Sequence, residues 1–124
     1  MNKTEEKWAW YLTSEKQAGK ILWFAFEDVT FRLTSKVPGT TRVSYTPDFV
    51  VVLPDSSIRV DEVKGPHIRE DSELKFKMAA DRYPFFDWRM VQLKEDGNFH
   101  LIRFIPRRKI DGRGTVEKFP EADG

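Results

Sequence analysis

The sequence predicts an α/β domain, with a mixed central β-sheet flanked by helices. Apolar runs at residues 50–53, 58–64 and 88–93 have the length and the β-branched or aromatic content of buried strands. The first two runs are separated by a short polar turn, which predicts an antiparallel hairpin. The order strand, helix, strand over residues 58–93 predicts a parallel crossover, so the sheet contains both kinds of pairing.

Length and composition limit the classes of protein that need be considered. A chain of 124 residues is a single domain with enough residues for a real core. The absence of cysteine excludes disulfides and thiolate metal sites. No apolar stretch approaches membrane-spanning length, so we expect a cytoplasmic protein with no membrane partner. The net charge of +1 means that any contact with DNA must come from local clusters of basic residues.

The N-terminal segment, residues 2–18, predicts a helix that stops at Gly19. Asn2 and Glu5 have the spacing of a capping box, in which each side chain bonds the backbone of the other residue. One helical face is apolar and should pack on the core through Trp8, Leu12 and Ala18.

The remaining elements follow from alternation and turn chemistry. Aromatic and β-branched residues at every second position predict strands at 21–26 and 29–33, with core packing as their explanation. Residues 35–42 predict a loop, either a plain solvated connection or a basic segment facing DNA. The other expected elements are a helix over 72–82 capped by Asp71, a strand at 88–93, a turn at 95–98 and a strand at 99–105.

The hairpin over residues 45–65 contains a pattern of charged residues that predicts a metal site. Pro47-Asp48 is followed by thirteen residues and then by Glu62-Val63-Lys64. If the turn centres near Asp55, Asp48 lies opposite Glu62, at the cross-strand side-chain distance of about 5 Å. Strand alternation then puts Lys64 on the same face as Glu62.

These residue types suit phosphoryl chemistry. Magnesium binds carboxylate oxygens, and a lysine beside it adds positive charge where a phosphate develops negative charge. A surface strand that ends in ordinary charged residues is the simpler alternative. Against it, the same face continues from Val50, Val52, Ile58 and Val60, and ionisable groups that extend a buried face are costly unless they pair or bind something.

The string Tyr45-Thr-Pro-Asp-Phe49 followed by Glu62-Val-Lys-Gly65 resembles the PD-(D/E)xK nuclease superfamily. Within it, the chain is most similar to phage and prophage nuclease domains related to the junction-resolving endonuclease I of T-odd bacteriophages. The resemblance extends from about residue 2 to about residue 91. It implies a restriction-endonuclease-like nuclease core over residues 1–106 and leaves residues 107–124 as a basic, flexible C-terminal tail.

The resemblance also implies an activity and a set of site residues. It implies a Mg²⁺-dependent endodeoxyribonuclease, with Mn²⁺ as a substitute, that hydrolyses branched or junction DNA as a homodimer in the host cytoplasm. Asp48, Glu62 and the backbone carbonyl of Val63 would hold the metal, and Lys64 would position the attacking water. A glutamate of the first helix completes the site in these domains, and the string Lys3-Thr4-Glu5 matches that segment.

The sequence leaves two points open. Glu5 could serve only as a helix cap, and Glu6 takes its place if the alignment shifts by one residue. The connection between Asp48 and Glu62 is longer than in the junction-resolving relative, which leaves the branched substrate and the dimer open.

The candidate DNA contacts are basic residues outside the motif. Lys75 matches a lysine of the phage domains, and the other candidates are Arg69, Arg107 and Arg108. Residues 107–124 form either an arm on the DNA backbone or a solubilising tail. From another class of function, the alternative is a non-catalytic DNA-binding or assembly protein that keeps the nuclease fold.

Overall fold

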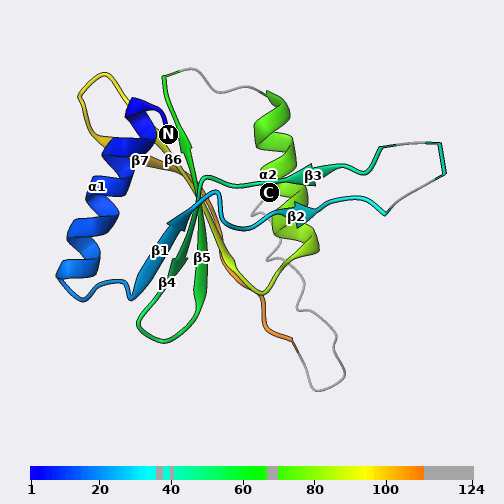
Figure 1. Cartoon of the computed structure of the whole chain (residues 1–124), viewed down its shortest axis with the longest axis horizontal. Helices are drawn as coiled ribbons and strands as arrows, with labels where there is room; N and C mark the ends of the chain where they lie inside the picture. The colour runs from blue at the N-terminus through cyan, green and yellow to red at the C-terminus, as the bar shows by residue number, and fades with distance from the viewer. Residues whose placement is uncertain (36–37, 40, 67–69, 111–124) are drawn as a thin grey trace, which may run out of the picture.

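A computed structural model describes residues 1–35, 38–39, 41–66 and 70–110 of the chain, without the side chains of residues 70 and 71. The α/β class is confirmed: a five-stranded sheet is flanked by two helices (Figure 1). Strand order is β1-β4-β5-β6-β7. The bounds are β1 Trp23–Phe26, β4 Phe49–Val52, β5 Ile58–Lys64, β6 Asp87–Leu93 and β7 Phe99–Ile105.

The sheet is mixed, as the sequence predicts. β5 and β6 are parallel, and the other neighbouring pairs are antiparallel. The helix α2 (Glu70–Arg82) makes the crossover between the two parallel strands. The register of β6 and β7 shifts at Met90 and Val91.

A second, two-stranded sheet stands beside the main one. It pairs β2 (Phe31–Arg32) with β3 (Ser44–Tyr45), and the connection between them extends away from the body of the domain (Figure 1). The sequence predicts a longer strand for β2 and none for β3. A two-residue strand carries too little alternation to be recognised.

Helix α1 (Lys3–Gln17) covers one face of the main sheet. Asn2 accepts a hydrogen bond from the Glu5 amide, and the Glu5 carboxylate accepts one from the Asn2 amide, which confirms the capping box. Trp8 and Leu12 are buried as expected, whereas the prediction for Ala18 is wrong. Ala18 is the C-cap, and the chain then turns away through Gly19 at φ 75°.

Helix α2 covers the other face. Phe76, Ala79 and Ala80 pack against Val60, Trp88 and Met90. The predicted cap at Asp71 is wrong, because α2 begins at Glu70 and Asp71 lies inside its first turn. Two cores therefore lie on opposite faces of the main sheet, and the core under α2 also includes Phe31, Leu33 and Tyr45 of the two-stranded sheet and its connection.

Residues 107 and 108, the first two of the predicted tail, are bound to the domain. The Arg107 amide donates to Asp87 Oδ1 at 2.8 Å, and the Arg108 amide donates to the carbonyl oxygen of Pro84 at 2.9 Å. Residues 111–124 lie outside the described residues. Within the described part of the chain, neither helix has the length and apolar character needed to cross a membrane.

Candidate functional site

The β4–β5 hairpin has the register that the sequence predicts. Val52 pairs with Ile58 and Phe49 with Asp61, so the turn centres on Asp55. The next step of this register puts Asp48 opposite Glu62. The Val63 amide donates to Asp48 Oδ2 at 2.7 Å, which fixes the Asp48 side chain at the end of β5.

Lys64 lies on the same side of β5 as Glu62, as strand alternation requires. Its ammonium is 3.3 Å from Glu62 Oε1 and donates to Ser72 Oγ at 2.8 Å. The other carboxylate oxygen of Glu62 accepts a hydrogen bond from the hydroxyl of Tyr45. Tyr45, Glu62, Lys64 and Ser72 thus form one chain of polar contacts that joins β3, β5 and the start of α2.

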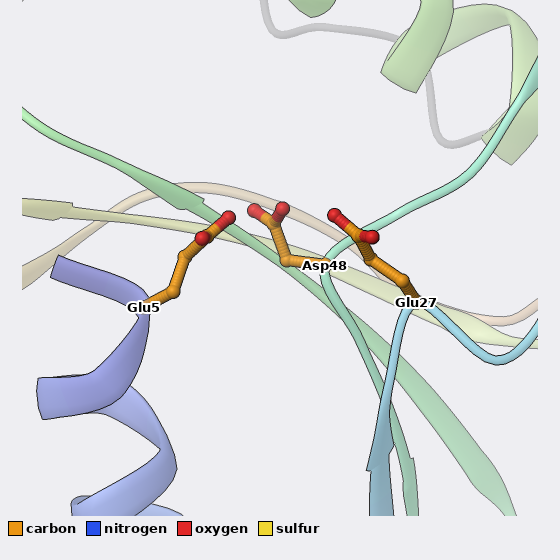
Figure 2. A group of neighbouring side chains, drawn as sticks. All are labelled: Glu5, Glu27 and Asp48. Carbon is orange, nitrogen blue, oxygen red and sulfur yellow. The ribbon is translucent and has the colours of Figure 1, made fainter. Parts of the chain in front are cut away.

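Three carboxylates meet beside this chain. Oxygens of Glu5, Glu27 and Asp48 all lie within 4.8 Å of one another. Figure 2 shows the three side chains converging, Glu5 from α1, Glu27 from the end of β1 and Asp48 from the segment before β4. We call these three residues the acidic cluster. Among the described residues, Glu5 and not Glu6 is the glutamate of α1 whose carboxylate belongs to this cluster.

Glu5 is confirmed as a helix cap, and its carboxylate also lies where the predicted ligand role requires it. Its Oε1 caps α1 through the Asn2 amide at 2.8 Å, and its carboxylate belongs to the acidic cluster. A carbon added at Gly65 would lie 4.0 Å from Thr4 Oγ1, which places the first turn of α1 next to the end of β5.

Glu27 is a site residue that the sequence does not single out. It has a positive φ of 48°, and its amide donates to the Asp48 carbonyl at 2.8 Å. The available signal is the polar pair Glu27-Asp28 between two apolar runs. That pair locates a turn, but only the pairing of Phe26 with Phe49 brings the turn next to Asp48.

Ionisation of Asp48 is unfavourable in the acidic cluster. Burial raises the pKa of Asp48 to about 8, and repulsion from Glu62 and contact with Glu5 act in the same direction. The Val63 amide, by donating to Asp48, opposes this rise. Burial and the neighbouring Glu62 carboxylate also raise the pKa of Tyr45.

The donor set fits a hard divalent cation. Glu5, Glu27 and Asp48 offer carboxylate oxygens, the ligands that Mg²⁺ and Mn²⁺ prefer, and a cation would stabilise their crowded negative charge. Glu62 is 6% exposed, and its two carboxylate oxygens are bonded to Tyr45 and Lys64, while its charge also acts on Asp48. A ligand role for Glu62 or for the Val63 carbonyl therefore stays a prediction.

The predicted DNA contacts fall in different places. Lys75 is half-buried on α2, one turn beyond Ser72 and therefore on the side that faces Lys64. Arg107 pairs with Asp55 at 3.4 Å and Arg108 with Asp81 at 3.9 Å, at the end of the sheet opposite the acidic cluster. Arg69 lies outside the described residues.

Comparisons with protein-family models, curated proteins and solved structures give no match to this chain.

Proposed function

We propose that this chain is a divalent-metal-dependent endodeoxyribonuclease with a PD-(D/E)xK-type core. The observation that carries the proposal is that the acidic cluster and the Lys64 ammonium lie at the same end of the β4–β5 hairpin. The acidic cluster offers three carboxylates to a cation, and Lys64 brings a positive charge to the same strand end. A cation site beside a fixed ammonium is what hydrolysis of a phosphodiester requires.

Each residue has a distinct task in this proposal. Glu5, Glu27 and Asp48 hold Mg²⁺ or Mn²⁺, which when bound supplies Lewis acidity at a phosphoryl oxygen. Lys64, fixed by Glu62 and Ser72, orients the attacking water and stabilises negative charge on the phosphate. Glu62 holds the Lys64 ammonium in place, and Tyr45 fixes Glu62 in turn.

The reaction is hydrolysis. The oxygen of water bonds to phosphorus, one ester P–O bond breaks, and the departing alkoxide takes up a proton as the hydroxyl end of the cut strand. Of the two hydrogens of the attacking water, one ends on the hydroxyl of the leaving group, and the other stays on the new terminal phosphate, from which it exchanges with solvent.

The proposed substrate is branched or otherwise structured DNA, and the proposed active form is a homodimer. Both follow from the resemblance of the motif to junction-resolving phage nucleases. The half-buried Lys75 supports a phosphate contact on the α2 side of the site.

A cleavage panel tests the proposal. Supercoiled, flapped and four-way DNA are incubated with the protein and Mg²⁺, Mn²⁺ or EDTA, and Asp48→Ala is run beside it. Asp55→Ala is the matched control, because Asp55 is an exposed aspartate of the same hairpin at the opposite end of β5. We expect metal-dependent cleavage that Asp48→Ala abolishes and Asp55→Ala retains. Cleavage by Asp48→Ala at the wild-type rate would refute the site.

The panel also distinguishes the proposed nuclease from the non-catalytic alternative. A protein that binds these DNAs tightly, and leaves every one of them intact with either metal, is a DNA-binding or assembly protein on a nuclease fold.

A further inference from the structure

Asp61 lies directly before Glu62, but on the other face of the sheet. Asp61 pairs with Phe49, whose side chain belongs to the core beneath α1, whereas Glu62 faces α2 and Tyr45. Asp61 is completely buried. It is therefore an acidic residue of the motif segment that stands apart from the acidic cluster.

The Asp61 carboxylate accepts five hydrogen bonds from three side chains. Arg59 donates to its two oxygens at 2.8 and 3.1 Å, and Arg89 donates to both at 3.2 Å. The fifth bond comes from the indole nitrogen of Trp8, at 3.1 Å. A buried carboxylate with this many hydrogen bonds is a rigid acceptor. Arg59 and Arg89 belong to β5 and β6, so among the described contacts Trp8 alone links Asp61 to an element outside these two strands.

Trp8 belongs to α1, and its contacts fix that helix against the sheet. The Arg89 guanidinium lies 5.2 Å from the centre of the Trp8 ring, and Phe99 packs edge-on against the ring at 4.9 Å. Trp8 is three residues after Glu5, so both lie on the same side of α1. A rotation or shift of α1 that breaks the Trp8–Asp61 bond would move Glu5 as well.

Glu5 needs such a constraint because it reaches the cluster from a helix on the far face. Lys64 and Glu62 belong to the side covered by α2, and α1 covers the side that contains Asp61. Figure 2 shows the Glu5 side chain extending from α1 toward Asp48, and the neighbouring Thr4 lies next to Gly65, directly after β5. A displacement of the Glu5 carboxylate by about 1 Å is enough to prevent it from binding a metal ion in the cluster.

We propose that Asp61 and Trp8 are positioning residues that set the helix α1 so that Glu5 enters the metal site. The inference rests on the proposed function, because it concerns the ligand role of Glu5. In this inference Asp61 does not bind the metal, although it directly precedes the motif residue Glu62 in the sequence.

Trp8→Phe is the variant that tests this, since it removes the indole N–H and keeps an aromatic ring. Asp61→Asn removes the carboxylate that pairs with the buried Arg59 and the partly buried Arg89, so this substitution endangers the fold itself. Trp10→Phe is the matched control, because Trp10 is on the same helix and 77% exposed. Circular dichroism first establishes that each variant is folded.

The measurement is a double-mutant cycle on Mn²⁺ affinity, read by calorimetry without DNA. We expect Trp8→Phe to weaken Mn²⁺ binding about tenfold, the loss usual for residues that orient metal ligands. In a Glu5→Gln background the same substitution should have no further effect, because Trp8 acts through Glu5. Trp10→Phe should leave the affinity unchanged in both backgrounds.

Hydrogen exchange in EDTA gives a second readout that needs no metal. We expect Trp8→Phe to speed exchange of the amides in the first two turns of α1 and to leave those of α2 unchanged.

Each of the other outcomes contradicts either this inference alone or the proposed function as well. Equal weakening in both backgrounds would make Trp8 an ordinary stabilising residue and overturn the inference, as would an unchanged affinity in Trp8→Phe. If Glu5→Gln alone leaves the affinity unchanged while Asp48→Ala abolishes binding, the inference fails and the proposed metal site stands. Unchanged Mn²⁺ binding in Asp48→Ala overturns the proposed function, and this inference with it.

Discussion

Asp48 is placed where a carboxylate is hard to ionise. It is 9% exposed, faces two other carboxylates of the cluster, and is opposed across the hairpin by Glu62. One backbone amide, that of Val63, offsets this by donating a hydrogen bond. In the proposed metal site such a residue would be an advantage, because the repulsion that weakens the fold without metal would become attraction once a cation is bound.

Asp48→Asn should stabilise the protein in EDTA at alkaline pH. The pKa of Asp48 rises from an ordinary value near 4 to about 8 on folding, so the native state holds a proton that the unfolded chain has lost. The stability that this proton provides is complete below pH 4 and is lost as the pH rises to 8. Asparagine has no charge to bury and keeps an oxygen for the Val63 amide. A gain of about 1 kcal/mol corresponds to roughly 4 °C in melting temperature.

The pH profile provides the control for this prediction. Melting temperatures of the two proteins should converge near pH 4 and separate toward pH 8. Curves that stay parallel across this range would show that the Asp48 carboxyl is not under electrostatic stress.

Lys64→Ala should separate catalysis from metal binding. The Lys64 ammonium contacts Glu62 and Ser72, and no carboxylate of the acidic cluster is among its described partners. We expect cleavage to fall by roughly a hundredfold or more, with Mn²⁺ affinity largely retained. Lys77→Ala is a suitable control, since Lys77 is a half-exposed lysine of α2. If Lys64→Ala cleaves at the wild-type rate, Lys75 becomes the candidate for this role.

At the scale of elements, the β4–β5 hairpin is the part that the sequence determines best. Its turn residues, its apolar run and its charged end are local features, so the register and the Asp48–Glu62 opposition can be predicted from residues 47–64 alone. The capping box of α1 is local in the same way.

Other features depend on contacts between distant segments and could not be predicted. Glu27 enters the site through the pairing of β1 with β4, and Asp61 finds Trp8 across 53 residues of sequence. β3 consists of two residues whose pairing with β2 is likewise set by the tertiary structure. The start of α2 lies one residue before the predicted cap, and Ser72 in its first turn contacts Lys64 of the distant strand β5.

Glu5→Gln tests the double role of the first helical turn. Glutamine can still accept the hydrogen bond from the Asn2 amide, so the cap and the melting temperature in EDTA should change little. The loss of a charged ligand should nevertheless reduce Mn²⁺ affinity and cleavage sharply. Full activity in this variant would return Glu5 to capping alone.

For the whole molecule, the two ends of the sheet differ in what they offer to DNA. The acidic cluster, Lys64 and Lys75 are near the end of β5, and Arg107 and Arg108 are bound to carboxylates near its start. A chain with a net charge of +1 has little long-range attraction for DNA, so under the proposed function its orientation on DNA must depend on a few contacts.

Salt dependence of DNA binding should identify those contacts. Each phosphate contact removed reduces the slope of log affinity against log salt by about 0.9 on duplex DNA. We expect this reduction for Lys75→Ala and a smaller one for Arg107→Ala combined with Arg108→Ala, because those two side chains already pair with Asp55 and Asp81. A larger change in the arginine variant would extend the DNA-binding surface to the far end of the sheet.

The most direct test of the central claim is a crystal structure of the full chain soaked in Mn²⁺, with anomalous scattering used to locate the ion. We expect an anomalous peak bound by oxygens of Asp48, Glu5 and Glu27, and no peak at that position in crystals of Asp48→Ala. Saturating Mn²⁺ that leaves the acidic cluster without an anomalous peak in the wild-type protein would contradict it.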